Sequence, residues 1–432
     1  MARARSISRH VLMAGVVLLL LLAPSQSAVA LAGFHVTPAD LLLLLLVPFA
    51  CAAAIANGLS WRRLFTVPFS SALFVILACV SAILSGHLKT GAGECIQFAL
   101  YFLVADRVFF IARALAAKSG RPVSDRGFRP FIAAFLAIGA VVVLVALWQL
   151  FTPLGDEPPS IRTVRGTFGN RNVLGGYYSL LLPFAFGLLF MKGTGPEQAK
   201  KLCLLRIGLV LLIVAGFCTI LSGAALLAIG LAVFALAVCH GRVAAVVTGV
   251  LLVGFLAYVA PNLPHDNLYA SIRSVELYDS ETGERTRRYP EWQAAVTMSF
   301  ERPWTGVGPG MYQSKIGTFY DIIPRATGPS EPDIQNMHLV LLSTCGFPAY
   351  LAFLAIFLSA IASGVTSRDP AARAAVCSLG AFLVVSIWHP LLVRGIGIPL
   401  AFLLAVARYS PMPEDSLISC KCDTIPKTDS KR

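Results

Sequence analysis

The sequence predicts an all-α membrane protein with about twelve transmembrane helices and a large extracytoplasmic loop that contains short helices. Apolar residues make up 57% of the 432 residues and charged residues only 13%, whereas a soluble domain carries roughly 25% charged residues. The mean hydropathy is +0.75. The charged residues lie between long apolar runs such as 131–150 and 204–221. Runs of ~20 apolar residues are long enough to cross a bilayer core as helices, which satisfy their own backbone hydrogen bonds.

The expected spans follow one another along the whole chain, so residues 1–432 form one polytopic membrane domain. Two pairs of spans share a tight turn, around Ser222 and around His389. A polar tail at 409–432 is expected to be disordered and cytoplasmic. The spans are approximately 11–32, 38–57, 67–86, 95–112, 130–151, 173–191, 204–221, 223–239, 243–261, 338–362, 371–388 and 392–408.

The basic residues predict the orientation of these spans. With the N-terminus in the cytoplasm, the short outer loops are poor in Lys and Arg, as the positive-inside rule requires. Both termini are then cytoplasmic, and the formal net charge of +13 reports orientation, so it does not require a nucleic-acid partner. Residues 1–30 also resemble a signal peptide, with Ala28-Val29-Ala30 as a cleavage site. We expect an uncleaved first span, and the alternative, cleavage, would leave the remaining topology unchanged.

Two outer segments are more polar than simple connectors, namely 152–172 and the large loop 262–337. Structureless loops longer than ~15 residues are usually functional or disordered. In the large loop, Trp292, Val296 and Phe300 recur at helical spacing, which predicts a short helix over 289–300 that lies across the bundle. Packing onto the membrane surface explains this apolar stripe.

An arginine cluster, Arg285, Arg287 and Arg288, comes just before this helix. Cations are unfavourable at a helix N-terminus, so the cluster indicates an anionic partner, although exposed arginines are often only solvated surface. One arginine guanidinium can donate two parallel hydrogen bonds to phosphate oxygens, and it keeps its charge at neutral pH. Arginine therefore suits a diphosphate ligand.

His338 opens the tenth span at the outer membrane interface, directly after the large loop. Such a histidine is often structural, but neutral imidazole is also the usual base near neutral pH. His389 occupies a similar turn with fewer polar neighbours and ranks second. Asp106-Arg107 lies inside the fourth span, where charge is costly and often functional. The alternative is that Arg107 extends toward the cytoplasmic side while Asp106 bonds to a neighbouring helix.

Metal ligands are sparse in the sequence. Glu331 and Asp333 form an acidic pair without a histidine at ligand spacing, and Cys420 and Cys422 lie in the tail as an acylation or metal site or as reduced thiols. None of the ten cysteines lies in the large loop, so no disulfide framework is expected there. No metal site and no cofactor are expected.

Three motifs together resemble the O-antigen ligase and polymerase family. Arg165–Pro183, RGTFGNRNVLGGYYSLLLP, is similar to the family's "RGTFGNPN" segment and the glycine-rich helix after it. Arg288–Trp292 with Pro303–Gly308, RYPEW and PWTGVG, resembles its large-loop signature. His338–Gly346, HLVLLSTCG, resembles the start of the following span. The resemblance covers about residues 35–405.

The resemblance implies a metal-independent, inverting glycosyltransferase of the bacterial inner membrane. Members transfer a glycan from undecaprenyl diphosphate, on the periplasmic face, to a lipid A-core sugar, another surface polysaccharide or a protein hydroxyl. Carried over to this sequence, Arg288 binds the diphosphate and His338 deprotonates the acceptor hydroxyl. Further contacts to the diphosphate or glycan are expected from residues in both outer segments: Arg165, Asn170, Arg171, Arg285, Arg287 and Trp292.

One position departs from the family pattern. The outer turn that carries Ser-Arg-Gly-Ala in family ligases has no arginine here and reads Ser222-Gly223-Ala224. Arg165 or Arg171 supplies the missing charge in one hypothesis. A different donor, or loss of activity, is the alternative. Ligase, polymerase and protein transferase share the motifs, and a solute transporter remains a further alternative.

Overall fold

The computed structural model describes residues 2–25, 29–31, 34–60, 66–117, 127–152, 164–191, 196–220, 222–259, 288–319, 336–393 and 395–410. Several expectations fall outside these ranges. They concern Arg285, Arg287, the acidic pair Glu331 and Asp333, and the tail beyond residue 410.

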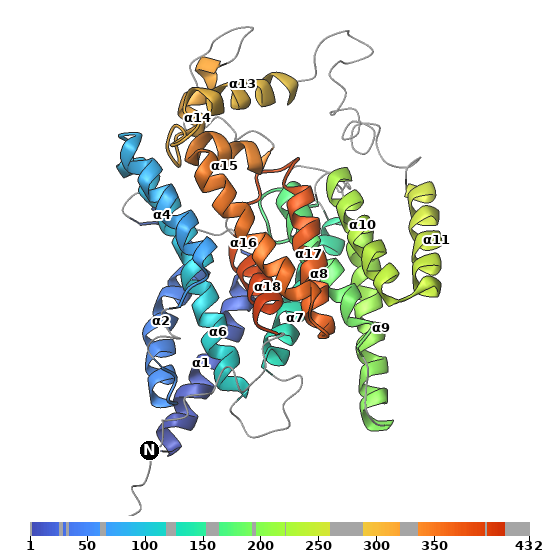
Figure 1. Cartoon of the computed structure of the whole chain (residues 1–432). Coiled ribbons are helices and arrows are strands. Elements are labelled where there is room, and N and C mark those ends of the chain that lie inside the picture. The colour runs from blue at the N-terminus through green and yellow to red at the C-terminus, as the bar shows by residue number, and fades with distance from the viewer. Residues whose placement is uncertain are drawn as a thin grey trace, which may run out of the picture.

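The described part of the chain is a helical bundle, with one hairpin of two three-residue strands, β1 (Val29–Leu31) and β2 (Phe34–Val36). Figure 1 shows the helices as a bundle that is covered at one end by α13. In chain order the helices are α1 (Ala2–Leu22), α2 (Pro38–Ala56), α4 (Phe69–Leu84), α5 (Leu88–Ala99), the π-helix η1 (Leu100–Ala105), α6 (Asp106–Ala117), α7 (Arg129–Gln149), α8 (Arg171–Leu188), α9 (Pro196–Thr219), α10 (Gly223–His240), α11 (Arg242–Val259), α13 (Arg288–Glu301), α14 (Tyr312–Lys315), the 3-10 helix η3 (Ile316–Phe319), α15 (Met337–Cys345), α16 (Phe347–Val365), α17 (Pro370–Val385) and α18 (Gly397–Tyr409).

The all-α membrane class is confirmed, but the number of about twelve spans is not. Among the described residues, six helices are long and apolar enough to cross a membrane: Pro38–Ala56, Leu88–Ala116, Arg129–Gln149, Leu202–Thr219, Gly223–His240 and Met337–Val365. Several other expected spans are shorter apolar helices, including α4 and α17 with 16 residues each and α18 with 13. Because α17 and α18 are largely covered by their neighbours, the apolar runs at these positions reflect burial within the bundle as well as contact with lipid.

The central helix of the bundle is α8. Most of its side chains are buried, and it packs against α17, α10 and α9. Two small residues allow this close packing: a Cβ added at Gly187 would lie 2.4 Å from the Cβ of Ala374 in α17, and one at Gly176 would lie 2.6 Å from Leu391. The motif helix recognised in the sequence therefore forms the core of the bundle.

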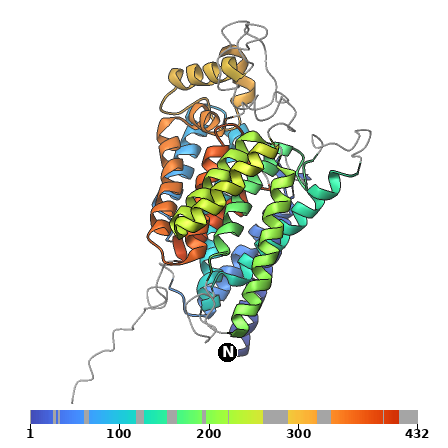
Figure 2. The same cartoon turned by 90° about the vertical axis from the view of Figure 1, so that its right-hand side faces the viewer.

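A small module covers one end of the bundle, which we call the capped end. It consists of α13, α14 and η3, and it lies over α15 (Figures 1 and 2). It has its own apolar cluster, which includes Ala295, Met298 and Tyr312. The short helix predicted at 289–300 is confirmed as α13, which spans Arg288–Glu301.

The module is tied to the bundle through backbone hydrogen bonds. The N–H groups of Val307 and Gly308 donate to the carbonyls of Ser343 and Thr344, both at 2.9 Å. Ser81 of α4 donates to the Thr344 carbonyl at 3.0 Å and also contacts Thr305. These bonds fix the segment after α13 to the C-terminal end of α15.

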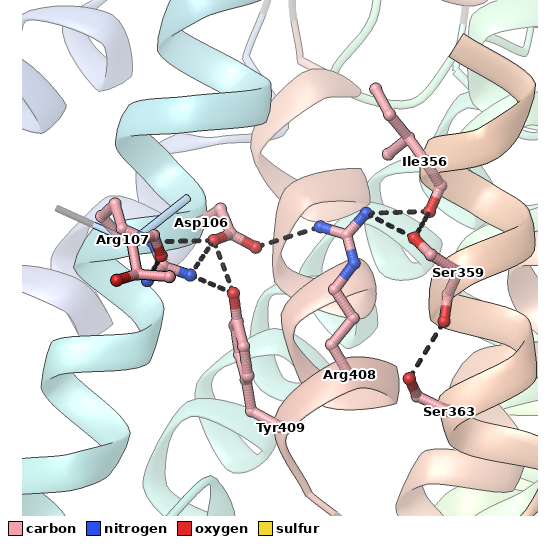
Figure 3. Close-up of polar contacts among 8 residues, drawn as sticks. Asp106, Arg107, Ile356, Ser359, Ser363, Arg408 and Tyr409 are labelled. Atoms are coloured by element: carbon pink, nitrogen blue, oxygen red, sulfur yellow. Dashed lines mark hydrogen bonds and ion pairs between the residues drawn. The ribbon is translucent and has the colours of Figure 1, made fainter. Parts of the chain in front are cut away.

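A buried charge cluster joins α6 to α18 (Figure 3). Asp106 is paired with Arg408 at 3.2 Å and with Arg107 at 2.5 Å, and it accepts a hydrogen bond from the Tyr409 hydroxyl at 2.7 Å. Arg408 also donates to the carbonyl of Ile356 at 2.8 Å. Ile356 lies ten residues after Gly346, or roughly 15 Å along α16 from the capped end.

Of the two interpretations of Asp106-Arg107, the bond from Asp106 to a neighbouring helix is observed. Arg107 turns onto the Asp106 carboxylate, and its guanidinium lies over the rings of Phe110 and Tyr409 at 4.8 and 5.5 Å. The pair therefore holds helices together in the described structure.

Candidate active site

A cavity of about 690 Å³ lies between α13 and the start of α15 and α16. Half of its lining residues are apolar and half carry polar side chains. They are Trp292, Gln293 and Val296 of α13, Asn336, His338, Leu339, Tyr350 and Ile387. Two residues singled out in the sequence, Trp292 and His338, therefore line the same cavity.

Local capping sets the position of His338. The Asn336 side chain accepts a hydrogen bond from the Leu339 N–H at 3.0 Å and so caps α15. The Met337 N–H donates to the carbonyl of Ser386, in the turn after α17, at 2.9 Å. His338, in the first turn of α15, is thus anchored both by its own helix cap and by the end of α17.

The two ring nitrogens of His338 have different partners. Nε2 lies 3.1 Å from the carbonyl oxygen of Leu383 and 3.2 Å from the Ser386 hydroxyl oxygen. Nδ1 lies 3.2 Å from the hydroxyl of Tyr350, and the rings of His338 and Tyr350 meet edge to face with centroids 5.9 Å apart. His338 is partly buried, so one part of its ring faces the cavity while the rest is held by protein groups.

A break between α15 and α16 brings Tyr350 to His338. Twelve residues of unbroken helix would separate the two by about 18 Å along the axis. Gly346 interrupts the helix with φ 81° and ψ 168°, a conformation that excludes side chains. The backbone of Trp304 lies against Gly346 so closely that an added Cβ would be 2.5 Å from its carbonyl oxygen. The glycine in the HLVLLSTCG motif is therefore required by conformation and by close packing.

The arginines of the large loop are only partly described. Arg288 is the first residue of α13, one helical turn before Trp292. Arg285 and Arg287 precede the described residues. The structure therefore places the start of the α13 backbone near one wall of the cavity, and the side-chain roles expected for the three arginines stay predictions.

The second motif lies at the N-terminus of α8. Asn170 caps this helix by accepting a bond from the Asn172 N–H at 2.7 Å. Before it, the buried amide of Gln149 holds the chain, accepting from the N–H groups of Arg165 and Gly166 and donating to the Gly166 carbonyl, at 2.8 to 2.9 Å. Asn170, Arg165 and Arg171 do not line the His338 cavity among the described residues.

The connector after α17 nevertheless links this motif to the cavity. Its Ser386 contacts His338, and three residues later His389 lies with Nε2 at 2.9 Å from the Ser222 hydroxyl. Ser222 caps α10 and packs against Gly175 of α8. The α8 N-terminus, the turn at Ser222 and the cavity thus lie at the same end of the bundle. His389 is buried beside Ser222 rather than lining the cavity, so its position favours a structural role.

The segment that contains this site matches a known protein family. Residues 207–354 match the family model described as O-antigen ligase. This match supports the resemblance to the O-antigen ligase family that the sequence motifs indicate. The matched segment includes α13, His338 and Tyr350, whereas the Arg165–Pro183 motif and Ser386 lie outside it. No curated protein matches the chain.

Several cavity residues were not predicted from the sequence. Gln293 adjoins Trp292, and Asn336 lies two residues before His338, so proximity in sequence could have indicated both. Tyr350 and Ser386 could not be found in this way, because their contacts with His338 depend on the break at Gly346 and on the turn after α17.

Proposed function

We propose that this chain is an O-antigen ligase-like glycosyltransferase that moves a glycan from undecaprenyl diphosphate to an acceptor hydroxyl of lipid A-core or another surface polysaccharide. The single observation that carries the proposal is the cavity between α13 and α15, which lies within the matched segment and is lined by both His338 and Trp292. In this function His338 is the general base, and the acceptor hydroxyl enters the cavity beside it.

The donor requires cations that meet the charge of the leaving diphosphate. Arg288 begins α13, and Arg285 and Arg287 precede it in the sequence. A diphosphate is an adequate leaving group when fixed positive charges stabilise it in the transition state, and arginine supplies such charges without a metal. Attack by the acceptor oxygen on the anomeric carbon, opposite the departing diphosphate, inverts the configuration there.

The apolar and aromatic walls of the cavity suit a sugar that is held partly by its ring face. Trp292 offers a flat apolar surface, while Gln293 and Asn336 carry amides that can bond to sugar hydroxyls. We assign the glycan or acceptor sugar to this wall. Arg165, Asn170 and Arg171 are proposed as further donor contacts from the α8 N-terminus, at the same end of the bundle.

Orientation follows from charge. The sequence between α6 and α7 and the N-terminal turn of α1 are rich in arginine, which favours a cytoplasmic location for the end opposite the cap. The capped end then faces the periplasm of a bacterial inner membrane, with both termini cytoplasmic. Undecaprenyl-diphosphate-linked glycan, the acceptor and membrane lipid are the expected partners.

The test is transfer by the full chain reconstituted in liposomes with undecaprenyl-diphosphate-linked glycan. Three reactions each offer a different acceptor. Transfer to lipid A-core indicates a ligase, transfer to a second carrier-linked glycan indicates a polymerase, and transfer to a peptide with hydroxyl side chains indicates a protein transferase. His338→Ala is expected to abolish transfer, because general bases typically contribute ~10²–10⁴-fold in rate. His240→Ala is the matched control, since His240 stacks on Phe190 at the far end of α10.

Equal turnover by wild type and His338→Ala would remove His338 from the mechanism. Absence of transfer to every acceptor, together with solute uptake by the same liposomes, would favour the transporter instead. Arg288→Ala is expected to lower transfer, and Arg165→Ala and Arg171→Ala are compared in the same assay. If both leave transfer intact, neither replaces the arginine missing from the Ser222 turn.

A further inference from the structure

The end of α17 determines which nitrogen of His338 carries hydrogen. At a helix C-terminus the last carbonyls lack intrahelical partners. Here the Ile387 N–H bonds to Val384 at 3.2 Å, and the Leu383 carbonyl instead receives the Ser386 hydroxyl at 2.8 Å and His338 Nε2 at 3.1 Å. A carbonyl oxygen only accepts hydrogen bonds. Nε2 of neutral His338 is therefore the protonated nitrogen.

The tautomer leaves the lone pair on Nδ1. The group that faces Nδ1 is the Tyr350 hydroxyl, at 3.2 Å, so this hydroxyl donates its hydrogen to the imidazole. Ser386 does not compete for the lone pair, because its hydroxyl lies on the Nε2 side and donates to Leu383. The basic nitrogen is thus covered by a tyrosine hydroxyl.

Tyr350 itself lines the cavity, and it is partly buried. With its hydrogen directed at Nδ1, the phenolic oxygen keeps lone pairs that can accept a hydrogen bond from another hydroxyl. Tyr350 is held in the first turn of α16, where its N–H bonds to the Gly346 carbonyl at 3.1 Å. An acceptor hydroxyl in the cavity can therefore bond to the Tyr350 oxygen without displacing the ring.

We propose that Tyr350 relays the acceptor proton to His338, an inference that rests on the proposed transfer reaction. The acceptor O–H gives its proton to the Tyr350 oxygen as the Tyr350 O–H gives its own to His338 Nδ1. The acceptor oxygen forms a bond to the anomeric carbon, and the bond from that carbon to the diphosphate oxygen breaks. The diphosphate leaves with the electron pair, His338 holds the proton as imidazolium, and tyrosine is restored.

The experiment compares wild type with Tyr350→Phe in the liposome transfer assay, run in mixtures of H₂O and D₂O. Tyr350→Phe removes only the hydroxyl, and it is expected to lower kcat by about 10²-fold, as loss of an acid–base group does, with KM for both substrates unchanged. For wild type, the plot of kcat against deuterium fraction is expected to curve, because two protons move in one step. For Tyr350→Phe the plot is expected to be linear.

Tyr178→Phe is the matched control, since it removes a buried tyrosine hydroxyl that bonds to Thr219 at 2.9 Å, away from the cavity. It is expected to keep the wild-type kcat and the curved plot. A linear wild-type plot overturns the relay without relying on any variant. So does a Tyr350→Phe enzyme with wild-type kcat while His338→Ala is inactive, and in that case the proposed base stands. If His338→Ala is as active as wild type, the proposed function fails together with the relay.

Discussion

Replacing Asp106 by asparagine keeps the shape of the side chain and removes its charge. In the native chain this carboxylate faces two guanidinium groups, those of Arg408 at 3.2 Å and Arg107 at 2.5 Å, and it accepts the Tyr409 hydroxyl. Asp106 and Arg408 are almost fully buried. The variant therefore leaves the buried Arg408 and the partly buried Arg107 without their counter-ion.

The expected cost can be bounded in two ways. Unit charges 4 Å apart interact by about 4 kcal/mol at an effective dielectric constant of about 20. Removing one partner of a buried ion pair costs about 3–5 kcal/mol in measured cases. We expect Asp106→Asn to lower the free energy of unfolding by about 3–5 kcal/mol. Glu301→Gln, which removes an exposed carboxylate at the end of α13, is expected to change it by less than about 1 kcal/mol.

The assay is denaturant unfolding in detergent micelles, followed by tryptophan fluorescence and extrapolated linearly. Arg408→Gln is measured alone and together with Asp106→Asn. Because the two residues share one interaction, the double variant is expected to cost less than the sum of the singles by about 1–3 kcal/mol. Two results would refute the argument that charge attraction in this cluster stabilises the packing of α6 against α18. One is additive costs of the two substitutions, and the other is a decrease below about 1 kcal/mol in the free energy of unfolding for Asp106→Asn.

Two further predictions follow from the same structure. Gly346→Ala is expected to destabilise the chain by at least about 2 kcal/mol and to lower kcat, because the left-handed conformation and the Trp304 carbonyl leave no room for a Cβ. Thermal unfolding and transfer measured on one preparation check both effects, and a native-like variant would contradict them. Gln149→Leu is expected to cost about 3 kcal/mol, since it removes the side-chain partner of two buried backbone groups of Gly166 and one partly buried N–H group of Arg165. An unchanged unfolding midpoint for Gln149→Leu would show that the α8 entrance is held by other contacts.

The sequence by itself determined the membrane class, the resemblance to a family and the helix in the large loop. Low charge and long apolar runs require a helical bundle, because lipid offers no hydrogen-bond partners to the backbone. Helical spacing of Trp292, Val296 and Phe300 was sufficient to predict α13, and His338 was identified at the start of α15. These features are local, so a single stretch of sequence contains the information.

The predicted number of about twelve spans is not confirmed, for a related reason. A high hydropathy means that a side chain avoids water. Burial against another helix removes the side chain from water just as contact with lipid does. The apolar runs of α17 and α18 are largely covered by protein, and these helices are shorter than a full crossing requires.

Only the tertiary structure decided how His338 is held. Tyr350 is twelve residues away along a predicted continuous span, and it reaches Nδ1 because Gly346 breaks that span. Leu383 reaches Nε2 because the turn after α17 releases its carbonyl from the helix. The spacing of these residues along the chain predicts neither contact. Helix breaks and helix ends are what allow side chains from different turns to converge on one imidazole.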